Sequence, residues 1–213
     1  MKILAIHGVG ESKGFSRKLR DRVQEARSGI IWDELFWSSS FVDQVNWFNN
    51  TVYSSHAGNS RLAELFHYMH PRLGHEVRME FWKNSIDADI IIGYSAGSVV
   101  AFDALTRWQT APTTGRRVPD SKLVLVTMGS PLALYAVSAG NLPDPNVVYW
   151  MNIYDARDPV SSPLAPVWGQ ENVDDVRVRT GGVLTAHLHY WDSKEVFEKV
   201  LSVVDFAAAI YQP

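Results

Sequence analysis

The feature that most constrains the fold is an apolar run followed at once by a glycine-flanked serine. Residues 90–92 are three isoleucines, residues 93–97 read Gly-Tyr-Ser-Ala-Gly, and residues 96–108 carry apolar side chains at helical spacing. A buried strand that enters a helix through so tight a turn brings the two elements very close, and glycine on either side leaves room for that approach. The pattern predicts a strand–turn–helix unit in which the Ser95 hydroxyl projects clear of the backbone.

The rest of the chain alternates short apolar segments with segments of helical periodicity. Expected helices cover residues 15–27, 96–108 and 193–209, with Ser193 as the N-cap of the last. Expected strands cover residues 3–6, 30–37, 89–92, 122–128, 147–154 and 173–179. Strands that alternate with helices predict an α/β fold, here a doubly wound, mostly parallel sheet of about six strands with helices on both faces.

Residues 38–84 interrupt this rhythm and are rich in aromatic side chains. We expect a helical insertion between the second strand and the strand before Ser95, packed over the carboxyl edge of the sheet. The insertion either lines an acyl pocket as a cap or forms a small helical core on the sheet. The chain has no linker or internal repeat that divides it, so residues 1–213 are expected to form a single domain.

Composition excludes several classes of function. The 213 residues are 46% hydrophobic, which suits one compact core, and the net charge of −3 disfavours nucleic acid as a partner. The absence of cysteine excludes disulfides, thiolate metal sites and cysteine nucleophiles. The first apolar run is too short for a signal-peptide core, and no stretch reaches membrane-spanning length, so a cytoplasmic protein is expected. His67 and His70 lack an H-E-x-x-H pattern, and neither a metal nor a cofactor is predicted.

Five segments, taken in chain order, resemble the α/β-hydrolase superfamily, in particular its bacterial lipase-like and esterase-like serine hydrolases. They are His-Gly-Val-Gly at 7–10, the serine turn at 93–97, Val-Thr-Met-Gly-Ser-Pro at 126–131, Arg-Asp-Pro-Val at 157–160, and a histidine beside Tyr190. Together they span nearly the whole chain. The resemblance implies an α/β-hydrolase fold with Ser95 as nucleophile and the order serine, aspartate, histidine.

A serine hydroxyl needs a base, and the base needs an orienting carboxylate. Asp155 and Asp158 both follow the fifth expected strand. By resemblance, Asp158 with the proline after it is the catalytic acid, whereas Asp155 caps the turn; both remain candidates at this point.

Two histidines, His187 and His189, lie between the sixth expected strand and the last helix. The resemblance selects His187 as the base, because it stands three residues before Tyr190. On an extended loop, His189 would face the same side as His187 and could contact substrate. Which of the two histidines is the base remains open.

The transition state of acyl transfer needs two backbone donors near the serine. The N–H of Ala96, which follows the nucleophile, is expected to be one, and by resemblance the N–H of Val9 is the other. His7 is expected to brace the loop that carries Val9. Tyr94 is expected to pack beneath the site or to contact substrate.

These residues predict hydrolysis of a small-molecule carboxylic ester or thioester through an acyl-enzyme on Ser95. Two alternatives stay open. A thioesterase or acyltransferase would use the same residues with another leaving group or acceptor. A non-catalytic binding protein of the same fold would keep the architecture without the chemistry.

Overall fold

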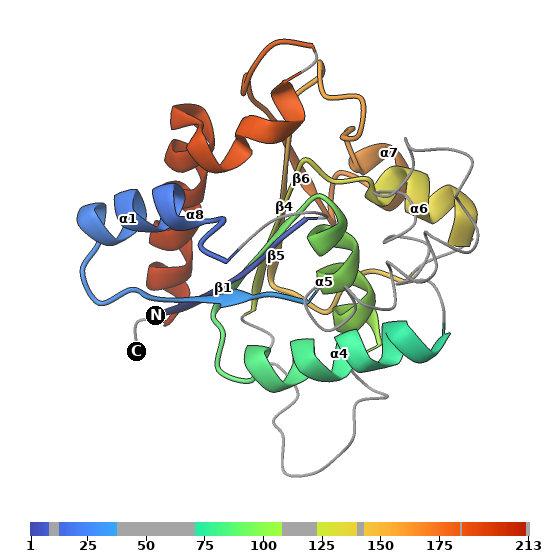
Figure 1. Ribbon diagram of the computed structural model, residues 1–213, viewed down its shortest axis with the longest axis horizontal. Coiled ribbons are helices and arrows are strands. Elements are labelled where there is room, and N and C mark those ends of the chain that lie inside the picture. The colour runs from blue at the N-terminus through green and yellow to red at the C-terminus, as the bar shows by residue number, and fades with distance from the viewer. Residues whose placement is uncertain (9–12, 38–70, 108–122, 140–142, 184, 212–213) are drawn as a thin grey trace.

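The computed structural model describes residues 1–8, 13–37, 71–107, 123–139, 143–183 and 185–211 (Figure 1). These residues form one six-stranded sheet with the strand order β2-β1-β3-β4-β5-β6, and every neighbouring pair is parallel. The strands are β1 (Lys2–Ile6), β2 (Ile31–Leu35), β3 (Ile90–Tyr94), β4 (Val124–Met128), β5 (Tyr149–Tyr154) and β6 (Asp174–Arg177). Each of them overlaps a range expected from the sequence.

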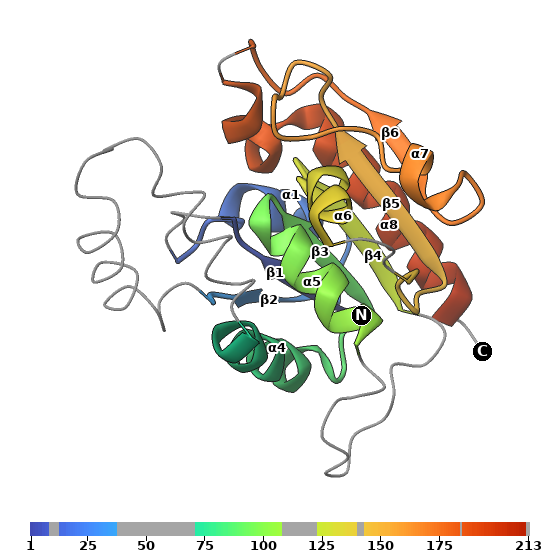
Figure 2. The same ribbon diagram turned by 90° about the vertical axis from the view of Figure 1, so that its right-hand side faces the viewer.

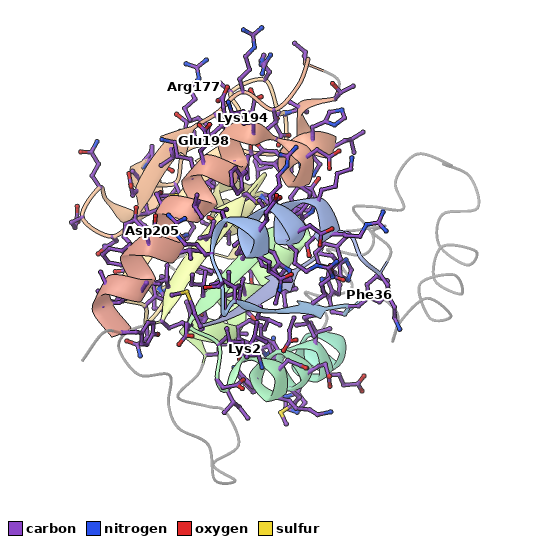
Figure 3. The ribbon with its side chains drawn as sticks, turned by 90° about the vertical axis from the view of Figure 1, so that its left-hand side faces the viewer. Lys2, Phe36, Arg177, Lys194, Glu198 and Asp205 are labelled. Atoms are coloured by element: carbon purple, nitrogen blue, oxygen red, sulfur yellow. The ribbon has the colours of Figure 1, made fainter. Side chains whose placement is uncertain are left out.

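Helices cover both faces of the sheet. α5 lies in front of the sheet in Figure 2 and α8 behind it, and Figure 3, from the opposite side, has α1 and α8 in front. The helices are α1 (Arg17–Ala26), α4 (Pro71–Ser85), α5 (Ala96–Thr106), α6 (Leu132–Ala139), α7 (Ala165–Trp168), the 3₁₀ helix η3 (Ala186–Asp192) and α8 (Lys194–Tyr211). The predicted α/β fold with a doubly wound parallel sheet is therefore confirmed.

Side chains that alternate between the two faces of the central strands divide the interior into two cores. Ile91 and Leu125 belong to the core shared with α4 and α5, whereas Ile90, Ile92 and Val124 belong to the core shared with α1 and α8. Successive side chains of a strand point to opposite faces, so a strand covered on both faces must be apolar at every position. This is why residues 90–92 of β3 and residues 124–126 of β4 are uninterrupted apolar runs in the sequence.

Of the two roles left open for the expected insertion, its described part corresponds to a helix packed in the core. Residues 71–85 form α4, which packs along α5: Phe81 and Trp82 are buried in the core with α5, and the indole Nε1 of Trp82 donates to the carbonyl of Ala104 at 2.9 Å. This helix is thus a layer of the main fold and does not cover the carboxyl edge of the sheet. Residues 38–70, which carry the rest of the prediction, lie outside the described residues.

The topology identifies the part of the sheet where a site can form. β1 leads into β2 on one side, whereas β3 lies on its other side, so the chain segments that leave β1 and β3 diverge. A crevice forms outside the carboxyl ends of strands where the strand order reverses in this way, and ligands of α/β proteins bind there. Here the two segments begin with His7 and Ser95. None of the helices in the described ranges is both long and apolar enough to cross a membrane.

A buried carboxylate with two arginine partners joins α4 to α5. The carboxylate of Asp103, whose side chain is 3% exposed, pairs with Arg78 of α4 at 2.9 Å and with Arg107, directly after α5, at 2.7 Å. Burying a carboxylate is unfavourable unless charges and hydrogen bonds compensate it, so the cluster holds together only as a unit.

We predict that Asp103→Ala lowers the free energy of unfolding by about 3 kcal/mol, because it leaves two guanidinium groups facing an uncompensated site. Urea unfolding measures the loss. Asp205→Ala is the matched control, since it breaks the pair between Arg27 and Asp205 (2.7 Å), whose side chains are 43% and 50% exposed, and should have a much smaller effect. Equal losses in the two variants would contradict a special contribution from the buried cluster.

Candidate active site

Ser95 occupies the turn between the last residue of β3 and the first residue of α5. Its φ of 52° and ψ of −128° make it the one non-glycine residue with positive φ among the described residues. Such a conformation is strained for a residue with a side chain and persists only when its surroundings enforce it. The Ser95 N–H donates to the carbonyl of Met128 in β4 (3.0 Å), and its own carbonyl accepts from the N–H (3.0 Å) and hydroxyl (2.5 Å) of Ser98.

The two glycines of the turn are required by close backbone contacts. A Cβ atom at Gly93 would lie 2.6 Å from the Cα of Ser98, and one at Gly97 would lie 2.4 Å from the carbonyl oxygen of His7. Both distances are far below van der Waals contact, and the obstructing atoms belong to the backbone. The spacing seen in the sequence is thus the spacing at which helix α5 meets β3 and the end of β1.

A pair of serines supports the turn from the side of the neighbouring strand. The hydroxyl of Ser98 lies 2.7 Å from that of Ser130, which follows β4 and also accepts from the N–H of Leu132 at 3.2 Å. All three residues are buried. The Gly-Ser-Pro sequence after β4 therefore has a structural role, because it holds α5 and the start of α6 together behind Ser95.

His187 joins Ser95 to Asp158. Its Nε2 lies 3.0 Å from the Ser95 hydroxyl oxygen, and its Nδ1 lies 2.8 Å from Oδ2 of Asp158. The three side chains come from the segments that follow β3, β6 and β5, all at the carboxyl edge of the sheet. The Asp158 side chain is fully buried, whereas 20% of the His187 side chain remains exposed. Solvent therefore reaches the histidine but not the carboxylate.

The surroundings of Asp158 keep it ionised. Burial raises the pKa of this carboxyl, but the hydrogen bonds from His187 and from the N–H of Val160 (2.9 Å, to Oδ1) outweigh it, and the pKa lies below its usual value. An ionised carboxylate has no hydrogen to donate, so the contact with His187 requires a hydrogen on Nδ1. The neutral ring then presents the lone pair of Nε2 to the Ser95 hydroxyl.

Asp155 has different partners. Its carboxylate accepts from the guanidinium of Arg157 (2.7 Å) and from the N–H (2.7 Å) and hydroxyl (3.1 Å) of Thr180. Burial raises the pKa of Asp155, but these hydrogen bonds, led by the one from Arg157, hold it well below its usual range. Of the two aspartates left open by the sequence, Asp158 is the one that contacts His187, and Asp155 fastens the turn to the segment after β6.

His189 does not share a side with His187. Residues 186–192 form the 3₁₀ helix η3, so the expectation of an extended loop was wrong. A 3₁₀ helix turns by about 120° per residue, which directs side chains two positions apart to different sides. His189 is exposed near the end of the helix, and its contact with substrate stays a prediction.

Tyr94 lies beneath the histidine. It is 3% exposed, its hydroxyl donates to the backbone carbonyl of His187, and its ring stacks on the imidazole with 5.3 Å between centroids and 30° between planes. Both contacts support His187 from the side of the sheet. Of the two roles predicted for Tyr94, these contacts correspond to packing below the site.

His7 ties the end of β1 to the end of β2. Its Nε2 accepts from the N–H of Trp37 (3.1 Å), its Nδ1 contacts the carbonyl of Gly8, and its own carbonyl accepts from the Trp37 indole at 3.0 Å. Burial lowers its pKa to about 4, so the ring is neutral at pH 7. A Cβ atom at Gly8 would lie 2.8 Å from that of Ser95, which shows how closely this segment passes the serine.

One of the two expected oxyanion donors belongs to α5. Ala96 is the first residue of α5 and is buried beside Ser95. The first N–H groups of a helix have no acceptor within the helix and point outward from its end, as an oxyanion donor must. Val9, His67 and His70 lie outside the described residues. Among the residues that are described, no three His, Asp or Glu side chains are grouped so as to hold a metal ion.

Sequence reasoning missed one contact of the site. The hydroxyl of Tyr190 lies 3.1 Å from the same Asp158 oxygen that accepts from His187. In the sequence, Tyr190 served only as a marker for the histidine. The signal that could have indicated its position is the spacing of three residues, which is one turn of a 3₁₀ helix.

No protein-family model matches the chain, and no curated protein matches its sequence. Similar solved structures include a cutinase-like protein from Cryptococcus sp. (TM-score 0.47, 14% identity, 97% of this chain and 93% of that one). An acetyl xylan esterase (0.45, 13%, 97% of each chain) and the azoreductase AzrA (0.35, 11%, 99% and 98%) are also similar. With TM-scores below 0.5, these likenesses identify neither a family nor an activity, so function must be inferred from the site.

We predict that Gly97→Ala lowers the unfolding midpoint sharply, because the added methyl group must displace either α5 or the end of β1. Overpacking costs about 1–3 kcal/mol in a core that can adjust, and two backbones adjust less than side chains do. Thermal unfolding measures the effect. Gly182→Ala is the control, since the nearest atom to its Cβ is 3.7 Å away. A Gly97→Ala variant as stable as the Gly182→Ala variant would contradict the close approach.

A second prediction concerns the acid sensitivity of the fold. Unfolded His7 binds a proton near pH 6.5, but the folded protein does so only near pH 4. The neutral ring of His7 therefore makes its full contribution to the free energy of unfolding above pH 6.5. This contribution falls by about 3 kcal/mol as the pH falls toward 4. Urea unfolding at a series of pH values should show a smaller loss for His7→Gln, which does not titrate. Parallel curves for the two proteins would show that the buried ring is not responsible.

Proposed function

We propose that this chain is a serine hydrolase that cleaves carboxylic esters or thioesters, with Ser95 as nucleophile, His187 as base and Asp158 as orienting acid. The observation that supports it is a continuous line of hydrogen bonds. It runs from the Ser95 hydroxyl through both ring nitrogens of His187 (3.0 Å and 2.8 Å) to a buried, ionised carboxylate. This arrangement activates an alcohol that is barely nucleophilic by itself.

In the proposed reaction, Nε2 of His187 takes the proton of Ser95 as the serine oxygen attacks the acyl carbonyl. Asp158 stabilises the resulting imidazolium, and the N–H of Ala96, with that of Val9, stabilises the negative carbonyl oxygen. The carbon–oxygen or carbon–sulfur bond then breaks, and His187 returns its proton to the leaving alcohol or thiol. Water, deprotonated by His187, attacks the acyl-enzyme and releases the acid with Ser95 restored. These steps use no cofactor.

The conformation of Ser95 supports a catalytic rather than a purely structural serine. Holding a non-glycine residue at positive φ costs about 1–3 kcal/mol, and a glycine would remove that cost. A binding protein has no use for this strain, whereas a nucleophile gains from it a hydroxyl that projects from the backbone at a helix N-terminus, which favours negative charge. The non-catalytic alternative thus leaves the strained serine and the ionised carboxylate behind His187 unexplained.

We predict that Ser95→Ala abolishes hydrolysis of a short-chain p-nitrophenyl ester, with a loss on the order of a thousandfold or more. A fluorophosphonate probe should label the wild-type protein covalently and leave the variant unlabelled. Ser85→Ala is the matched control: Ser85 is also buried, its hydroxyl has no partner among the described residues, and it lies at the end of α4.

Each outcome of this experiment is informative. Labelling and turnover in the Ser85→Ala variant should equal those of the wild type. A wild-type protein that neither reacts with the probe nor cleaves any ester or thioester would favour the binding protein. Labelling without hydrolysis, with turnover restored by an added alcohol or thiol acceptor, would identify an acyltransferase that uses the same residues.

A further inference from the structure

The hydroxyl of Tyr190 lies at the centre of a buried hydrogen-bond network behind His187. Tyr190 is fully buried, and three polar atoms surround its oxygen. Oδ2 of Asp158 is 3.1 Å away, the N–H of Asp155 is 2.9 Å away, and the hydroxyl of Ser161 is 3.0 Å away. Two segments are thereby joined: the turn after β5, which carries both aspartates, and η3, which carries His187.

Chemistry fixes the direction of two of these bonds. A phenol has one hydrogen and two lone pairs, and a carboxylate only accepts. The N–H of Asp155 must donate to the Tyr190 oxygen. Between the hydroxyls of Ser161 and Tyr190 either can donate; when Ser161 donates, both lone pairs of the Tyr190 oxygen are used and the phenol hydrogen bonds to Asp158. A charged acceptor binds a donor more strongly than a neutral hydroxyl does, so the bond to Asp158 is the favoured one.

The local fold brings the side chains of Tyr190 and His187 to the same oxygen atom of Asp158. Residues three apart in a 3₁₀ helix lie on one side of it, and both side chains reach Oδ2 of Asp158 from there. The other carboxylate oxygen accepts from the N–H of Val160. Room for the tyrosine ring comes from Gly129, where φ is +58° and a Cβ atom would lie 3.0 Å from the ring.

We propose that Tyr190 is a positioning residue of the site: its hydroxyl orients the Asp158 carboxylate and reduces its basicity, which sets the pH range in which His187 accepts the serine proton. This inference rests on the proposed function and extends it to a residue that never touches substrate. Tyr190 affects His187 because both side chains bond to the same oxygen, Oδ2 of Asp158. Each donor to Oδ2 withdraws negative charge that the other would use, so the tyrosine bond moderates the bond to His187.

Other charged groups nearby are already paired. Asp155 is bound by Arg157 and Thr180, and Glu195 at the start of α8 accepts from the N–H of Arg179. Tyr94, packed beside Tyr190 with 5.9 Å between ring centroids, is uncharged and donates to the backbone of His187. Among these groups, Tyr190 and His187 are the side chains that donate to the carboxylate of Asp158.

Tyr190→Phe tests this proposal, because it removes the hydroxyl and keeps the ring. Loss of a hydrogen bond to a charged group should lower kcat for a p-nitrophenyl ester about tenfold while KM stays within about twofold. The inactivation rate with a fluorophosphonate should fall equally. The acid limb of the kcat/KM profile should move to higher pH, because an unshared Oδ2 makes protonation of His187 easier.

Tyr149→Phe is the matched control. It also removes a hydrogen bond from a tyrosine to an aspartate, Asp174 at 2.6 Å, but at the opposite end of β5. Its kcat and its pH profile should match those of the wild type. Ser161→Ala should likewise keep kcat within about twofold, since Tyr190 retains its bond to Asp158. A loss in Ser161→Ala as large as that in Tyr190→Phe would overturn the proposal in favour of general packing.

A second substitution keeps the test valid if Tyr190→Phe fails to fold. Incorporation of 3-fluorotyrosine at position 190 retains the hydroxyl and makes it a stronger donor, so the acid limb should move to lower pH. An unchanged limb would overturn the proposal. Failure of the proposed function looks different: the wild-type protein itself would neither react with the fluorophosphonate nor cleave an ester, whatever residue stands at position 190.

Discussion

The close approach of α5 to the end of β1 determines where the rest of the site can lie. A Cβ atom at Gly97 would collide with the carbonyl of His7, and one at Gly93 would collide with the backbone of Ser98. Between these contacts the chain must reverse within one residue, and Ser95 takes the positive φ that this requires. The backbone of Ser95 is therefore held by three strands and a helix, and its hydroxyl contacts His187 at 3.0 Å, which is what preorganisation of a nucleophile demands.

Two aspartates of one turn have separate roles. Asp155 is saturated by the Arg157 guanidinium and by Thr180, so it anchors the turn after β5 to the segment after β6. Asp158, three residues on, keeps one carboxylate oxygen for His187 and Tyr190. Without the carboxylate of Asp155, the turn that carries Asp158 would lose its bonds to Thr180. Stability and the geometry of the site are thus linked through a residue that has no contact with Ser95 or His187 among its described bonds.

Local signals in the sequence predicted the strands, the serine turn and the last helix, because these depend on periodicity and glycine spacing. The choice of Asp158 over Asp155, and of His187 over His189, depended on resemblance, since the contacts involved are tertiary. η3 was mistaken for an extended loop because seven residues carry no distinguishing period. Residues 38–84 were expected to be helical, and residues 71–85 are, but aromatic content does not state which surface a helix will cover, and Phe81 and Trp82 pack in the core with α5.

Tyr94 connects the serine and the histidine mechanically. It precedes Ser95 in the chain, so its backbone moves with the turn, while its hydroxyl and ring hold the backbone and imidazole of His187. Gly129 makes this possible, since a side chain there would collide with the rings of both Tyr94 and Tyr190. The Gly-Ser-Pro segment after β4 thereby serves both halves of the site, with Gly129 seating the tyrosines and Ser130 bonding to Ser98. A shift of β4 would therefore displace serine and histidine together and keep their separation, which protects the 3.0 Å contact from small movements of the sheet.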